Sequence, residues 1–217
     1  MSGRPTWRWV GDRALLSEFP GAELAAANRS ARALDRSLRE RSFPEVEDSI
    51  PAARSLLVLL HPGLGPSAEL VSALEAEAET DESSAAPASR DHEITVVYGG
   101  EAGPDLARIA GVSGLSEREL VAAHSSVVYT VGFLGFVPGF AYLFGLPAKL
   151  AVPRLATPRT RVPAGSVAIG GEFTGIYPRA TPGGWSIIGR TDLALFDPTR
   201  DPPALLRPGD RVRFLAR

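Results

Sequence analysis

From Val131 onward, glycine and proline divide the chain into short apolar runs. These two residue types make up 23 of the last 87 residues, against 18 of the first 130. Proline lacks a backbone donor and glycine weakens the interior of a strand, so long regular elements are disfavoured here. Short β-branched and aromatic runs between such turns are typical of a barrel or a sandwich. The predicted runs, starting at Ser126, are SVVYTV, SVAI, TGIYP, WSII, LALF and RVRFLA.

A different pattern occupies the first part of the chain. Apolar residues recur three and four positions apart over 24–38, which predicts a helix with one buried stripe. The dipeptide Gly11-Asp12 lies between two apolar runs and predicts a hairpin. Strands followed by helices in this order indicate an α+β domain with the helices on one face of a small sheet. The expected elements are strands at 7–10, 14–19 and 55–60, and helices at 24–38 and from Pro66-Ser67 onward.

Charge is distributed unevenly between the two parts. Residues 1–140 carry 12 cations and 20 anions, whereas residues 141–217 carry 11 cations and 5 anions. The overall net charge of −2 therefore hides a cationic second part. We expect an N-terminal α+β domain over 1–82, a linker poor in large apolar residues over 83–90, and a second domain of short strands, a barrel or a sandwich, over 91–217.

Several classes of protein are disfavoured by what the sequence lacks. It has no cysteine, which excludes thiolate chemistry and cysteine-ligated metals. Its histidines at 61, 92 and 124 are too far apart in the sequence to form a helical ligand pair, so no metal is expected. Neither GxxxxGK[ST] nor GxSxG occurs. The near-neutral charge argues against nucleic-acid binding. An apolar run long enough for a membrane span and a signal peptide are also missing, so a cytoplasmic protein is expected.

Candidate site residues are concentrated in 132–147 and 153–191, where aromatic residues, glycines and prolines accompany five arginines. Guanidinium groups bind carboxylates or phosphates in a bidentate manner, so the cluster predicts a surface for an anionic small molecule. Two alternatives remain: the aromatic residues form the barrel core, or they form a wall against a partner protein. The predicted substrate-binding residues are Phe136, Pro138, Phe140, Tyr142, Arg154, Ser166, Gly170, Gly171, Thr174, Tyr177, Gly183, Gly184, Trp185 and Arg190.

The same residues carry a family resemblance, which extends from about Glu93 to Phe214. The stretches VVYGGEAGPDLARIAGVSGLSERELVAAHSSVVYTVGFLGFVPGFAYLFGLP and TPRTRVPAGSVAIGGEFTGIYPRATPGGWSIIGRT are similar to the family of 5-oxoprolinase B subunits. This family is also called allophanate hydrolase subunit 1, or the KipI family. The resemblance implies an α+β protein in which a small ferredoxin-like α/β sandwich precedes a cyclophilin-like β-barrel.

The resemblance also implies a function. Family members act with the 5-oxoprolinase A subunit and with the C subunit, which is of the allophanate hydrolase subunit 2 type, to cleave 5-oxo-L-proline to L-glutamate with ATP as co-substrate. Such a protein is expected to be inactive alone. Two alternatives within the family are a KipI-type inhibitor of a sensor histidine kinase and a component of the urea carboxylase or allophanate hydrolase type.

If the chain acts in an enzyme, three side chains have expected catalytic roles. His124 is the proton carrier, the alternative being a core histidine. Arg159 or Arg161 holds the substrate carboxylate or the phosphate. The backbone amides of Gly170-Gly171 and Gly183-Gly184 are expected to stabilise developing oxyanion charge.

Overall fold

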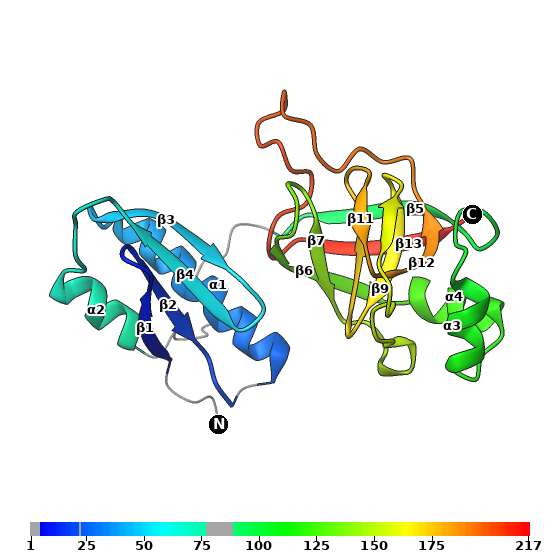
Figure 1. Cartoon of the computed structure of the whole chain (residues 1–217), viewed down its shortest axis with the longest axis horizontal. Helices are drawn as coiled ribbons and strands as arrows, with labels where there is room; N and C mark the ends of the chain where they lie inside the picture. Colours follow the sequence, from blue (N-terminus) through cyan, green and yellow to red (C-terminus); the bar gives the residue numbers. More distant parts are fainter. Residues whose placement is uncertain (1–4, 22, 77–88) are drawn as a thin grey trace. The chain divides into compact units, whose positions relative to one another are not determined.

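The chain folds as two compact units, Met1–Ala88 and Ser89–Arg217, in a computed structural model that describes residues 5–21, 23–76 and 89–217 (Figure 1). The boundary between the units falls within the predicted linker 83–90, of which residues 83–88 lie outside the described residues. Each unit has its own cluster of buried apolar side chains. The two units are therefore described separately.

The first unit is a two-layer sandwich of one antiparallel sheet, in the order β1-β2-β4-β3, and two helices that share its buried core. The predicted stripe forms one long helix, whose first turn is capped by the Glu23 carboxylate accepting from the Ala26 N–H. Leu34 and Leu38 on this stripe are buried, as the spacing predicts. The elements are Thr6–Val10 (β1), Ala14–Glu18 (β2), Leu24–Arg41 (α1), Val46–Pro51 (β3), Ser55–Leu60 (β4) and Ala68–Glu75 (α2).

The α+β class is confirmed, with one difference in element order and one strand that was not predicted. The order is β-β-α-β-β-α, which keeps the two layers of a ferredoxin-like sandwich but not its β-α-β-β-α-β order, because each helix follows a hairpin. The additional strand, β3, lies at the edge of the sheet and exposes Glu47, Asp48 and Ile50. An edge strand does not need the regular apolar alternation that reveals a buried strand.

The second unit is a closed seven-stranded barrel in the order β10-β7-β6-β13-β5-β12-β9, which confirms the predicted barrel. All neighbouring strands are antiparallel except β5 and β13. The described helices include none that is long and apolar enough to cross a membrane. The elements are Asp91–Tyr98 (β5), Leu106–Val112 (α3), Glu117–Ser125 (α4), Val128–Leu134 (β6), Ala141–Phe144 (β7), the 3-10 turn Ala148–Leu150 (η1), Arg159–Val162 (β8), Ser166–Gly170 (β9), Phe173–Ile176 (β10), Thr181–Gly183 (β11), Ser186–Arg190 (β12) and Arg211–Ala216 (β13).

One predicted strand, LALF at 193–196, is wrong. The segment belongs to the long connection between β12 and β13, where Phe196 forms an isolated bridge with Ala204. Leu195 is buried, whereas Leu193 is exposed. Leu193 and Leu195 would lie on the same face of a strand, so one exposed and one buried leucine show that the segment does not alternate as a strand does.

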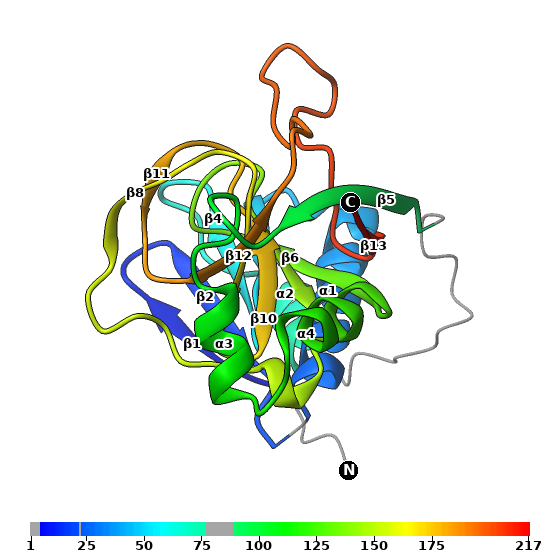
Figure 2. The same cartoon turned by 90° about the vertical axis from the view of Figure 1, so that its right-hand side faces the viewer.

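Two apolar layers share the barrel wall. Val167 and Ile169 of β9 point into the barrel core, whereas Ala168 between them belongs to a second cluster on the outside of the wall. This outer cluster includes Val162, which comes from a two-stranded ribbon formed by β8 and β11. Figure 2 shows the ribbon on the side of the barrel away from β13. The outer cluster holds the candidate site.

Candidate functional site

Aromatic side chains from several segments form a continuous layer on the outside of the barrel wall. Phe140 is its centre, with ring centroids 5.1 Å from Tyr142, 5.3 Å from Tyr177 and 5.3 Å from Trp185. Edge-to-face contacts predominate, an arrangement that aromatic pairs favour. The barrel core is a different cluster, but Phe140, Tyr177 and Trp185 are themselves buried in this second apolar cluster, each 4% exposed or less. We call this set the aromatic layer; it consists of Phe133, Phe136, Phe140, Tyr142, Phe144, Phe173, Tyr177 and Trp185.

Two predicted site glycines make room for this layer. A Cβ on Gly170 would lie 2.6 Å from the Trp185 indole, and one on Gly183 would lie 2.4 Å from the Tyr177 hydroxyl oxygen. The neighbouring Gly171 donates its N–H to the Val152 carbonyl at 2.8 Å. That amide is already engaged, so we do not retain its predicted role as an oxyanion donor. In this structure the glycines serve the packing of rings against backbone.

Arg159 is held by the buried carboxylate of Asp105, which no pattern in the sequence singled out. Its Nη2 donates to Asp105 Oδ1 at 2.9 Å, while Asp105 Oδ2 accepts the Ile187 N–H of β12 at 2.7 Å. The Asp105 side chain is 9% exposed and that of Arg159 is 31% exposed. Asp105 precedes α3 and lies 54 residues from Arg159 along the chain, so local spacing contains no signal for the pair. Arg159 therefore attaches the β8–β11 ribbon to the barrel, which differs from the substrate-holding role predicted for it.

Arg154 is the cation best placed to act beside the aromatic layer. Burial raises the pKa of both Tyr142 and Tyr177, and the charge of Arg154 acts in the opposite direction on each hydroxyl. The backbone of Trp185 also hydrogen-bonds the Tyr177 hydroxyl and lowers that pKa. Among the described residues, no hydrogen bond or ion pair engages the guanidinium of Arg154 or of Arg161, and both residues are exposed. Arg154 is thus free to bind an anion next to two tyrosines.

His124 lies inside the barrel with 0% of its surface exposed. Thr174 donates its hydroxyl proton to the Ala168 carbonyl at 3.1 Å and therefore accepts from His124 Nε2 at 3.0 Å. The Nδ1 atom then accepts from the Tyr98 hydroxyl at 2.8 Å, which assigns the Nε2–H tautomer. Burial lowers the pKa of His124 to about 3.

This environment corrects the expectation for His124, because a neutral ring with both nitrogens engaged and no solvent contact cannot exchange protons with a surface substrate. The ring is also stacked on Phe214, with centroids 4.7 Å apart. The alternative interpretation, a core histidine, describes it. Periodicity placed His124 on the buried face of its helix, but only the tertiary structure shows what that face packs against.

The remaining predicted residues are dispersed. Thr174 points into the barrel toward His124 and is separated from the aromatic layer by the wall. Ser166 is buried at the start of β9, and Arg190 is exposed at the end of β12. Pro138 is exposed in the loop between β6 and β7. The structure therefore brings together the aromatic residues, Arg154 and the site glycines, but not these four.

An unusual turn lies at the edge of the aromatic layer. Phe136 has φ 67°, and the Val137 N–H donates to the Gly135 carbonyl at 2.7 Å, which closes a γ-turn around Phe136. A positive φ is a true outlier for a bulky residue. The Phe136 side chain is 58% exposed, and its ring meets Phe140 at 5.6 Å between centroids.

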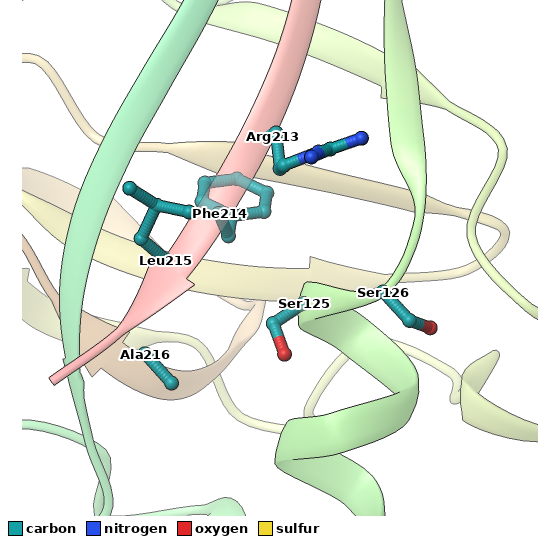
Figure 3. Close-up of a pocket in the computed structure, with 6 residues that line it drawn as sticks. All are labelled: Ser125, Ser126, Arg213, Phe214, Leu215 and Ala216. Atoms are coloured by element: carbon teal, nitrogen blue, oxygen red, sulfur yellow. The ribbon is translucent and has the colours of Figure 1, made fainter.

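A separate hollow of about 430 Å³ lies at the end of α4 beside β13 (Figure 3). The guanidinium of Arg213 and the hydroxyls of Ser125 and Ser126 point away from one another in this view. Both serine hydroxyls donate to carbonyls of their own helix, Ser125 to Val121 at 2.8 Å. Because its polar groups do not converge, this hollow is a poorer candidate than the aromatic layer.

Comparison with known proteins identifies the class and then the family. Residues 5–206 match the carboxyltransferase domain, subdomain C and D. The chain is 50% identical to the B subunit of 5-oxoprolinase from Escherichia coli O157:H7 over 95% of its own length and 93% of that protein. The chain belongs to the family of 5-oxoprolinase B subunits, as the resemblance in its sequence predicted.

Two solved structures share the fold. The crystal structure of TTHA0988 matches with a TM-score of 0.81 and 38% identity over 95% of this chain, which spans 40% of that longer chain. The urea carboxylase of Kluyveromyces lactis matches with a TM-score of 0.79 and 22% sequence identity. The match covers 98% of this chain and 22% of the urea carboxylase chain. The second likeness shows the fold alone. In both proteins a unit like this one is part of a larger chain.

Proposed function

We propose that this chain is the B subunit of an ATP-dependent 5-oxoprolinase, which cleaves 5-oxo-L-proline to L-glutamate together with an A subunit and a C subunit. The observation that carries the proposal is the 50% identity to a curated 5-oxoprolinase B subunit over nearly the whole of both chains. That relative is named as one subunit of an enzyme, which supports a multi-subunit assembly. In this proposal the chain is inactive alone, and ATP is a co-substrate of the assembled complex.

The chemistry requires activation of a poor electrophile. A phosphoryl group transferred from ATP to the lactam oxygen makes the carbonyl carbon electrophilic and leaves ADP. Water then adds to that carbon, the ring C–N bond breaks, and the nitrogen keeps the electron pair and becomes the amine of glutamate. A second water removes the phosphate, so one ATP and two waters are used for each ring opened.

In this proposal the chain binds and orients the substrate. Arg154 pairs with the substrate carboxylate, which stays ionised throughout the reaction, and the half-buried ring of Tyr142 lies beside it. A planar guanidinium can hold a carboxylate through two parallel hydrogen bonds.

The test is reconstitution from purified components. We expect the chain copurified with the A and C subunits to release glutamate from 5-oxoproline only when ATP is present. A verified complex that releases none would contradict the proposal. Replacing Arg154→Gln should raise KM for 5-oxoproline about tenfold to hundredfold, the range for a lost charged hydrogen bond. The control is Arg118→Gln on α4, an exposed arginine outside the aromatic layer.

A further inference from the structure

The Phe136 turn is built to hold an apolar side chain in solvent. Phe136 is 58% exposed at the apex of the loop between β6 and β7, although phenylalanine normally favours burial. Its backbone adopts φ 67°, which favours glycine over a bulky residue. Neither feature benefits the isolated fold. Strained backbone of this kind is retained mainly at functional sites.

The turn is also rigid. Besides the γ-turn hydrogen bond, Gly135 donates its N–H to the Phe140 carbonyl at 3.1 Å, and Phe140 donates to the Val137 carbonyl at 3.0 Å. Behind the exposed ring, Phe140 is only 1% exposed, and Tyr177 lies 6.3 Å away between centroids. The ring is therefore presented on a fixed base. A preorganised aromatic side chain loses little entropy when it binds, which is the property of an interface anchor.

We propose that Phe136 is the anchor through which this chain docks on the C subunit, where it enters an apolar pocket with an acidic rim. The proposal rests on the proposed function, which supplies the partner. The acidic rim is inferred from charge: Arg154, which acts on the hydroxyl of Tyr177 beside Phe136, is an exposed cation that no hydrogen bond or ion pair engages among the described residues. Aromatic residues and arginine are the residue types enriched at interface anchors.

The exposed ring suits a protein partner better than the substrate. A small anion such as 5-oxoproline gains little from a phenyl ring that projects into solvent, whereas a protein surface can bury the whole ring. In TTHA0988 the equivalent of this chain makes up only 40% of the molecule, so further protein accompanies the fold in a relative.

The experiment measures the affinity of the purified full-length chain for the purified C subunit by titration calorimetry. We expect Phe136→Ala to weaken binding at least about 30-fold, the effect of removing an interface anchor. Alanine keeps a Cβ and therefore the same backbone strain, so circular dichroism and the melting temperature should remain near those of the unmodified chain. Phe136→Leu should restore part of the affinity. The matched control is Leu215→Ala on β13, which is 38% exposed and lies across the barrel from β9 and β10.

Each other outcome overturns the assignment in a distinguishable way. Unchanged affinity for Phe136→Ala, or equal losses for Phe136→Ala and Leu215→Ala, would refute Phe136 as the anchor while leaving the proposed function intact. Unchanged affinity with a raised KM for 5-oxoproline would place the ring in the substrate site. A self-associating chain that becomes monomeric on Phe136→Ala would make a second copy the occupant. If the unmodified chain binds neither the C subunit nor the A subunit, the proposed function fails as well.

Discussion

Replacing Asp105 by asparagine should loosen the β8–β11 ribbon from the barrel. The Asp105 carboxylate accepts from two donors, Arg159 Nη2 at 2.9 Å and the Ile187 N–H at 2.7 Å. Asparagine has one acceptor oxygen and one NH₂ group, so one of these donors must face another donor. The guanidinium of Arg159 also loses its counter-ion. The change keeps the side-chain volume and therefore isolates hydrogen bonding and charge from packing.

The expected cost follows from the exposure of the two partners. Breaking a fully buried ion pair costs about 3–5 kcal/mol, whereas an exposed pair contributes about 1 kcal/mol or less. Asp105 is 9% exposed, but about a third of the Arg159 side chain reaches solvent. We therefore expect a loss of about 2–3 kcal/mol in the free energy of unfolding. For a unit of this size, that lowers the melting temperature by about 6–9 °C.

Urea unfolding of a double-mutant cycle checks the mechanism. Asp105→Asn, Arg159→Met and their combination should give a coupling energy of about 1.5–2 kcal/mol, because the double variant leaves neither member of this pair without its partner. Arg108, whose Nε lies 3.8 Å from Asp105 Oδ1, keeps its charge in all three variants. The control is Asp91→Asn, whose partner Arg211 lies at 3.4 Å with both side chains more than half exposed. It should change stability by less than about 0.5 kcal/mol. A coupling below about 0.5 kcal/mol for Asp105 and Arg159 would refute this ion pair as the attachment of the ribbon.

Two further predictions concern the barrel. The pKa of His124 is about 3 in the folded chain and near 6.5 in the unfolded chain. Between these two values only the unfolded chain binds the proton. The free energy of unfolding therefore falls by up to about 1.4 kcal/mol for each unit by which the pH is lowered. Urea unfolding between pH 7.5 and 5 should show a smaller dependence of the unfolding free energy on pH in His124→Gln than in the unmodified chain. The same pH dependence in both proteins would contradict this prediction. Gly170→Ala should destabilise the chain by about 1–3 kcal/mol, because the new Cβ would lie 2.6 Å from Trp185. Gly135→Ala is the control, because its Cβ would make only ordinary contacts of 3.5 Å or more. Thermal melts of the two variants make the comparison.

The sequence indicated which residues cluster but not what each of them does. Aromatic residues and glycines crowded into 132–147 and 153–191 indicated that these segments meet, and the aromatic layer brings them together, with Phe140, Tyr177 and Trp185 buried in it. Arg154 and Arg159 were indistinguishable by type and setting, because the contact that separates them comes from Asp105 far along the chain. The role of His124, as a proton carrier or a core residue, was ambiguous for a similar reason. Helical spacing states which face is buried but not whether a substrate or a barrel core lies against it.

The sequence by itself determined the class of each unit and the family. A stripe at helical spacing and short runs between glycines and prolines restrict the backbone locally, so an α+β unit followed by a barrel or a sandwich could be derived without coordinates, and the family resemblance selected the barrel. Only the tertiary structure decided which side of the barrel wall each side chain occupies, and hence that His124 is sealed inside while Arg154 and Phe136 face outward. The physical reason is that charge, exposure and proton affinity depend on neighbours brought from distant segments, and local spacing does not encode those neighbours.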